Sequence, residues 1–121
     1  MIVGLGNDVV RINRFERSAE RFAKRLLTAA ELAQYQSRGK PLAFIAKRWA
    51  AKEAAAKALG TGIAAGVSFQ HFCVSNDAAG KPHLALSGRA KQLADALGVK
   101  SIHLALSDEK ELAMATVILE S

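Results

Sequence analysis

The chain has 121 residues, half of them hydrophobic and 23% charged, which is the composition of one globular domain over residues 1–121. The formal net charge of +6 favours an anionic partner, such as nucleic acid, an acidic protein or a phosphorylated small molecule. No apolar run approaches the roughly 20 residues that span a bilayer, and the N-terminus lacks a basic leader, so we expect a cytoplasmic protein without a membrane partner.

Hydrophobic periodicity and breaker residues predict a series of short elements along the chain. In chain order they are a strand that begins at residue 1 and ends near Asp8, helices over 12–28, 28–37 and 42–59, strands over 69–75 and 83–87, a helix over 88–97, and strands over 101–108 and 112–120. Thr28 and Glu31 form a capping-box pattern, whereas Asn13 and Ser87 are candidate caps for the helices that follow them. Short connections favour antiparallel pairing, so we expect an α+β fold with the long helix on one face of a mostly antiparallel sheet.

The single cysteine, Cys73, lies in an alternating apolar run and is interpreted as a small core residue. It excludes an internal disulfide. The three histidines are scattered and lack the close ligand pairs of a zinc site.

The long helix carries the residues that are most suggestive of chemistry. Trp49, Glu53 and Lys57 are spaced at i, i+4 and i+8, so they lie on one helix face. One interpretation is a solvated ion pair between Glu53 and Lys57, which contributes little to stability. The alternative is a buried functional face, because a tryptophan accompanies the charges and the first strand ends near another carboxylate, Asp8. Two carboxylates beside a lysine suit Mg²⁺ together with phosphate oxygens.

Five segments together resemble the holo-[acyl-carrier-protein] synthases, the short bacterial 4'-phosphopantetheinyl transferases. They cover most of the chain in the family's order and read IVGLGNDVVRINRFE, RFAKRLLTAAEL, RWAAKEAAAKALGTG, NDAAGKPHLALSG and IHLALSDEKELAMATVILE. The resemblance implies transfer of 4'-phosphopantetheine from coenzyme A to a serine of apo-acyl carrier protein, with release of adenosine 3',5'-bisphosphate. It also implies a homotrimer with active sites shared between adjacent subunits.

The resemblance assigns residue roles by position. It implies Mg²⁺ ligands at Asp8 and Glu53, a pyrophosphate contact at Lys57, and a set of residues around the nucleotide part of coenzyme A: Arg48, Gly60, Thr61, Gly62, Gly80, Lys81 and Pro82. It implies docking of the acidic carrier on Arg14, Arg21 and Arg25. Glu53, directly or through a water, is the candidate that organises removal of the serine proton.

One position departs from the family pattern. Asp108 stands where some members carry histidine, so a histidine base cannot be assumed there. Three roles stay open for Asp108: a metal ligand, the base, or the residue that starts the turn to the last strand. His103, on the same predicted strand, either faces a pocket or is an ordinary half-buried histidine.

Two alternative functions remain at this point. One is the same reaction on a dedicated polyketide-type carrier in place of the fatty-acid carrier, and the sequence does not choose between them. The other is a non-enzymatic nucleic-acid-binding module, which the charge permits. Aromatic residues make up only 6% of the chain and no nucleic-acid motif is present, so we expect no nucleic-acid partner.

Overall fold

The computed structural model describes all residues from 1 to 121 and contains five strands, four α-helices and two 3-10 helices. In chain order the elements are β1 (Ile2–Arg11), η1 (Ile12–Ser18), α1 (Ala19–Leu26), α2 (Ala29–Ser37), α3 (Leu42–Ala58), η2 (Phe69–His71), β2 (Phe72–Asn76), β3 (Pro82–Leu86), α4 (Gly88–Ala96), β4 (Ser101–Asp108) and β5 (Leu112–Glu120). The α+β class expected from the sequence is confirmed. None of the helices combines the length and apolar character needed to span a membrane.

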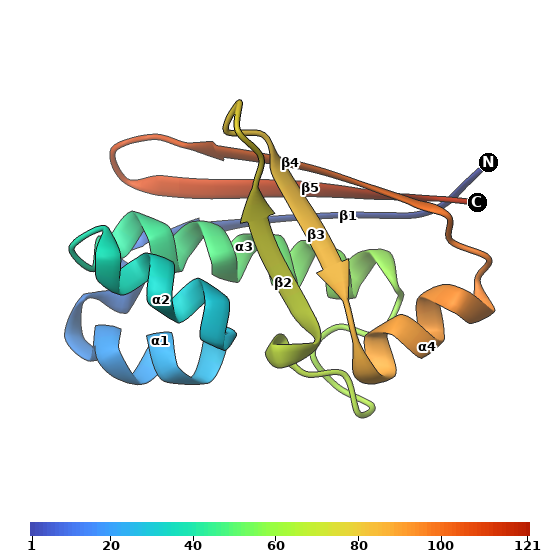
Figure 1. Cartoon of the computed structure of the whole chain (residues 1–121), viewed down its shortest axis with the longest axis horizontal. Coiled ribbons are helices and arrows are strands. Elements are labelled where there is room, and N and C mark those ends of the chain that lie inside the picture. The colour runs from blue at the N-terminus through green and yellow to red at the C-terminus, as the bar shows by residue number, and fades with distance from the viewer.

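The strands form two antiparallel sheets. One has the order β1-β5-β4, and the other is the β2-β3 hairpin. Helix α3 runs along one face of the three-stranded sheet, with the hairpin and the α1-α2 pair on its other side (Figure 1). The sequence predicted the hairpin and the β4-β5 pair, and both are present. The first strand adds to β5, the last strand of the chain.

Several predicted boundaries are corrected by the structure. The helix expected over 12–28 begins as the 3-10 helix η1 and becomes α-helical only at Ala19. The strand expected from Phe69 begins at Phe72, because the preceding residues form η2. The Thr28–Glu31 capping box is present, but Ser87 makes no capping hydrogen bond with its side chain.

The core lies between α3 and its neighbours on both sides. Most of α3 is buried, including a series of alanines that line its contact with the sheet. On a second face of α3, Trp49 packs against an aromatic cluster with Phe15, Phe22 and Phe69. The expectation that the tryptophan marks a packed helix face is therefore confirmed.

Candidate active site

The close approach of α3 to β1 places the first candidate carboxylate. A Cβ atom at Gly4 would lie 2.3 Å from the carbonyl oxygen of Ala58, and one at Gly6 would lie 2.0 Å from that of Ala54. Only glycine allows the strand and helix backbones to lie this close. Because side chains alternate along a strand, Asp8 points to the same face as Gly4 and Gly6, toward α3. The glycine spacing is visible in the sequence, but its role becomes clear only with the helix in place.

Lys57 connects this carboxylate to α3. Its Nζ atom donates to Oδ1 of Asp8 at 3.0 Å and to the carbonyl oxygen of Asn7 at 3.0 Å. The Asp8 side chain is 15% exposed, whereas that of Lys57 is 51% exposed. The ion pair of Lys57 is thus with Asp8 on the strand, and the surface pair with Glu53 considered from the helical spacing is not formed. A half-exposed ammonium group remains accessible to an anionic ligand.

Glu53 lies one helical turn before Lys57 and is half-buried. Burial raises the pKa of its carboxyl above the ordinary 4.5, and the charge of Asp8 raises it further, while Lys57 and Arg14 act in the opposite direction. Asp8 contacts Lys57, which lies one helical turn after Glu53, so both carboxylates flank the same lysine and their charges repel each other. A cation between them would remove this repulsion, so the pair fits a hard divalent ion.

No third metal-binding side chain joins the pair, since the chain contains no group of three or more histidine, cysteine, aspartate or glutamate residues placed to hold a metal ion. Mg²⁺ commonly takes one or two carboxylates and fills its other positions with water and substrate phosphates. The donor set of Asp8 and Glu53 is therefore compatible with magnesium and leaves room for a phosphorylated substrate.

Asp108 lies away from this pair within one chain. Asp8 aligns across the sheet with Ala115 of β5, whereas Asp108 aligns with Ala113 and is separated from β1 by the whole of β5. Strands lie about 4.8 Å apart, so the two aspartates are roughly 10 Å apart or more. Asp108 ends β4, and its Oδ1 lies 3.7 Å from Nζ of Lys47. Asp108 therefore does not join the Asp8–Glu53 pair within one chain, and its roles as metal ligand or base stay predictions.

Arg48 occupies the buried side of α3. It is 2% exposed, and its Nη2 atom lies 3.4 Å from Gln34 Oε1 and 3.3 Å from Asn76 Oδ1. Its guanidinium also stacks over Phe44 and lies 3.8 Å from the Glu31 carboxylate. In this conformation the side chain is part of the packing between helices and hairpin and presents no surface to a nucleotide. The nucleotide contact implied for Arg48 stays a prediction that requires it to move.

The other predicted coenzyme A residues lie in two separate places. Gly60, Thr61 and Gly62 follow α3 directly, and the amides of Thr61 and Gly62 both donate to the carbonyl oxygen of Ala56. Gly60 and Gly62 adopt φ angles of 85° and 65°, which favour glycine. This loop begins three residues after Lys57, so one end of the site is continuous with the helix that carries the lysine.

The second place is the turn between β2 and β3, which contains Gly80, Lys81 and Pro82. Asp77 holds the turn by accepting bonds from the amides of Ala79 and Lys81. Lys81 and Pro82 line a hollow of about 300 Å³ between β3 and β4, together with other residues that include His83 and His103. Because β4 and β1 are opposite edges of the sheet, this turn and Asp8 are not brought together within one chain.

His103 is exposed and lies beside this hollow. Its Nε2 atom is 2.9 Å from Oε1 of Glu120, and this contact lowers the pKa of the Glu120 carboxyl. The pocket-facing alternative for His103 is therefore the one that the structure supports.

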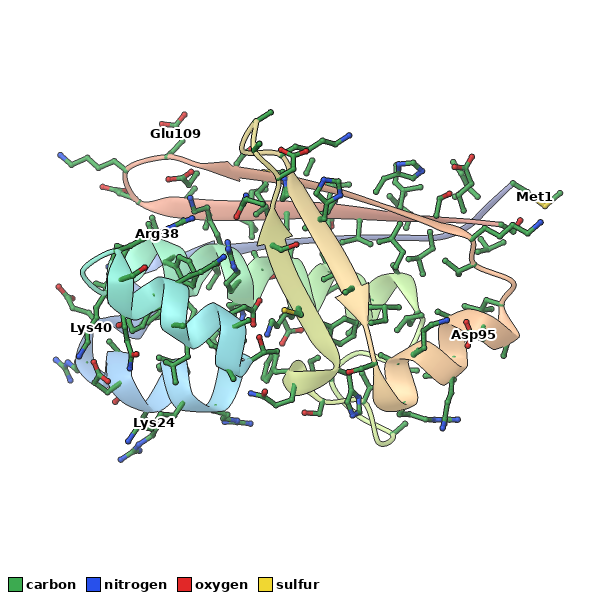
Figure 2. The ribbon with its side chains drawn as sticks, in the orientation of Figure 1. Met1, Lys24, Arg38, Lys40, Asp95 and Glu109 are labelled. Atoms are coloured by element: carbon green, nitrogen blue, oxygen red, sulfur yellow. The ribbon has the colours of Figure 1, made fainter.

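The predicted carrier-docking arginines all lie on η1 and α1. Arg14 stacks over the Trp49 ring at 4.6 Å and contributes to the electrostatics of Glu53. Arg21 and Arg25 are exposed on α1. Figure 2 shows Lys24, which lies between them in the sequence, pointing away from the body of the molecule. The basic surface thus begins next to the carboxylate pair and continues along α1.

The model of the 4'-phosphopantetheinyl transferase superfamily matches residues 4–117. The chain belongs to this superfamily. It is 57% identical over 124 aligned residues to a protein named holo-[acyl-carrier-protein] synthase from Photobacterium profundum, an alignment that covers 99% of this chain and 98% of the relative. A protein of the same name from Yersinia enterocolitica is 55% identical, with the same coverage.

Solved structures agree with this assignment. The holo-[acyl-carrier-protein] synthase of Neisseria meningitidis matches with a TM-score of 0.89 and 40% identity over 100% of both chains. That of Bacillus anthracis, in complex with CoA (3',5'-ADP), matches with a TM-score of 0.85 and 41% identity, covering 100% of this chain and 98% of that one. The family resemblance and the fold inferred from the sequence motifs are confirmed, and the chain is a transferase of this family.

Proposed function

We propose that this chain transfers 4'-phosphopantetheine from coenzyme A to a serine of apo-acyl carrier protein and releases adenosine 3',5'-bisphosphate. The observation that carries this proposal is the pair of carboxylates from separate elements, Asp8 and Glu53, beside the accessible ammonium of Lys57. Membership of the superfamily and the relatives named as holo-[acyl-carrier-protein] synthases support the same reaction.

Asp8 and Glu53 hold the metal ion in this proposal. Mg²⁺ bound there would neutralise charge on the pyrophosphate, which is the main requirement of a phosphoryl-type transfer. Lys57 would lie beside the pyrophosphate oxygens as well, since its Nζ atom is 3.0 Å from Oδ1 of Asp8.

The bond changes define what the protein must supply. The serine oxygen forms a bond to the phosphorus on the pantetheine side, and the bond from that phosphorus to the bridging oxygen breaks. The electron pair leaves with adenosine 3',5'-bisphosphate, and the serine proton passes to a base. Glu53, directly or through a water, is our candidate for organising this proton transfer, because it lies one helical turn from Lys57, beside the proposed pyrophosphate site. Within one chain, Asp108 is too far from the pair to share this role.

We also propose a homotrimer in which neighbouring subunits complete each site. The outer face of the three-stranded sheet is unusually apolar for a surface, with four exposed large side chains: Leu5, Val9, Leu112 and Met114. The distance between Asp8 and the turn at Gly80-Lys81-Pro82 supports the same idea, because a second chain would be needed to bring the two together. Light scattering should give three times the 12.9 kDa of one chain, and a monomeric mass would contradict this assembly.

The basic surface of η1 and α1 is the proposed docking site for the acidic carrier. Arg14, Arg21 and Arg25 are exposed, and the chain carries an overall charge of +6, so attraction would be long-ranged and weakened by salt. The fatty-acid carrier is our proposed partner, and a polyketide-type carrier is the alternative. Nothing in the structure favours a nucleic-acid module, and the expectation of a cytoplasmic enzyme stays a prediction.

A mass-shift assay tests the reaction. Purified protein, coenzyme A and Mg²⁺ are incubated with several apo-carriers, and each carrier is weighed by mass spectrometry. The proposal expects a gain of one phosphopantetheine on a carrier serine, and chelation of the metal should prevent it. Unchanged masses on every carrier, beside an active relative as the positive control, would refute the proposed function.

A further inference from the structure

The C-terminal end of α1 is held by side chains from two other elements. The last carbonyl oxygens of a helix have no partner within the helix and must be satisfied elsewhere. Nε2 of Gln70 donates to the carbonyl oxygens of Arg25 at 3.1 Å and Leu27 at 2.9 Å. Nζ of Lys52 donates to the carbonyl oxygen between them, that of Leu26, at 2.6 Å. Three consecutive carbonyls are thus bound by only two side chains.

Lys52 anchors this end of α1 in the interior of the protein. Its side chain is fully buried, and the same Nζ atom lies 2.6 Å from Oε1 of Glu31, which is also fully buried. Burial lowers the pKa of Lys52, and the Glu31 carboxylate opposes this effect. A positive charge at a helix C-terminus is favourable, so the ammonium suits its place at the end of α1.

Glu31 extends the connection to two further segments. Its Oε1 atom accepts the amide of Thr28, and its Oε2 atom accepts the amide of Val74 at 2.8 Å. The α1-α2 junction, α3 and β2 are therefore joined at one buried carboxylate. Lys52 directly precedes Glu53 in α3, so this network fixes the end of α1 relative to the helix that carries the candidate metal ligand.

We propose that Lys52 and Gln70 are positioning residues for the carrier: they fix α1, with its exposed arginines, in register with the Asp8–Glu53 pair. This inference rests on the proposed docking of the carrier on α1. A carrier bound to α1 must present its serine to a fixed point near Glu53. If the end of α1 moves, its arginines are no longer held in one arrangement, so the carrier binds more weakly in the productive orientation and KM for the carrier rises.

Gln70→Met is the most direct test because Gln70 is exposed and methionine preserves the length of the side chain but cannot donate. Gln92→Met, on the exposed side of α4, is the matched control. We expect Gln70→Met to raise KM for the apo-carrier about 3- to 10-fold while KM for coenzyme A stays unchanged. Hydrogen exchange should become faster in the last turn of α1, and Gln92→Met should change none of these quantities.

A second variant tests the buried half of the clamp. The ammonium is absent in Lys52→Met, but the Glu31 carboxylate still has Arg48 3.8 Å away as a cation, so Lys52→Met leaves no buried charge unpaired. This variant should fold and keep its KM for coenzyme A, but KM for the carrier should rise at least as much as in Gln70→Met. If Lys52→Met does not fold, the exposed Gln70 decides the question alone.

Arg21→Glu separates the clamp from the docking surface on which it depends. If Arg21→Glu raises KM for the carrier but Gln70→Met leaves both this KM and the exchange of α1 unchanged, the clamp is refuted and the docking surface stands. If Arg21→Glu has no effect on carrier kinetics, the proposed docking surface is wrong and the positioning role falls with it. Equal increases in both KM values for Gln70→Met would show a general disturbance and would also refute the proposal.

Discussion

Helix α3 carries two lysine-carboxylate arrangements that look alike in sequence and differ in structure. On one side Lys52 meets Glu31, with both side chains fully buried at 2.6 Å. On the other side Lys57 meets Asp8 at 3.0 Å, with the lysine half exposed and Glu53 nearby without a tight partner of its own. The first carboxylate has its bonding capacity filled by the protein, whereas the second site keeps capacity for a ligand. The number of free bonding positions therefore distinguishes a structural ion pair from a functional one.

The largest expected effect is on turnover at the second site. Asp8→Asn and Glu53→Gln each remove a negative charge from the proposed metal site and should lower kcat/KM roughly 1,000-fold, as when a main electrostatic contact to the transition state is lost. Neither change should impair folding, because asparagine and glutamine keep the size and hydrogen-bonding capacity of these half-buried side chains. Carrier mass-shift kinetics at saturating Mg²⁺ measure the first effect, and urea unfolding measures the second. Near-normal turnover in both variants would show that the Asp8–Glu53 site is no more functional than the buried Lys52–Glu31 pair.

The two lysines should respond oppositely to the same substitution. Lys52→Met removes the closer of the two cations beside the buried Glu31 carboxylate, together with the bond to the Leu26 carbonyl, and should cost about 3–5 kcal/mol of unfolding free energy. Lys57→Met, at a half-exposed ion pair, should cost less than about 1 kcal/mol but lower turnover. Denaturant unfolding of both variants checks the contrast. Similar losses of stability for both lysines would show that burial does not separate them.

The close contact of β1 with α3 should be sensitive to one methyl group. Gly6→Ala places a Cβ against the Ala54 carbonyl, so strand and helix must move apart at a cost of about 1–3 kcal/mol. The same movement separates Asp8 from Glu53 and should weaken turnover. Thermal unfolding and the mass-shift assay measure the two effects, with the exposed Ser101→Ala as control. A variant as stable as the parent would mean that the backbones are less close than described.

The smallest expected effect is the pH dependence that Glu53 contributes to stability. Its pKa is raised in the folded state, so between the ordinary 4.5 and the raised value the folded protein binds more protons than the unfolded chain. The contribution of Glu53 to stability should therefore fall as pH rises through this window. The unfolding free energy of Glu53→Gln is subtracted from that of the parent chain at each pH, and the difference gives the contribution of Glu53. If this contribution instead rises with pH, the fold stabilises the charged form of Glu53, which would contradict the raised pKa.

The sequence predicted much of this molecule because its local patterns agree with its tertiary structure. The helix that ends at Gly60, the capping box of Thr28 and the two hairpins follow from side-chain preferences alone. The pairing of β1 with β5 joins opposite ends of the chain, and no local pattern contains it. Periodicity also does not distinguish the 3-10 helix η1 from the α-helix that follows it.

The site was only partly predictable because its contacts depend on how β1 packs against α3, which local sequence patterns do not contain. The spacing of Glu53 and Lys57 shows a shared helix face, but the actual partner of Lys57 is Asp8, which depends on the strand and helix packing through Gly4 and Gly6. Arg48 is basic and lies in the same motif, yet the fold turns it into the interior. Helical spacing gives the direction of a side chain but not which side of the helix meets water.

The most direct test of the account compares the two faces of α3 in one assay. The carrier mass shift is followed with coenzyme A and limiting Mg²⁺ for the parent chain, for Glu53→Gln and for Lys52→Met. We expect Glu53→Gln to leave the carrier unmodified, whereas Lys52→Met should still convert it when the carrier is saturating. Full conversion by Glu53→Gln, or a dependence on Mg²⁺ that the variant leaves unchanged, would contradict the central claim that Asp8 and Glu53 form the catalytic metal site.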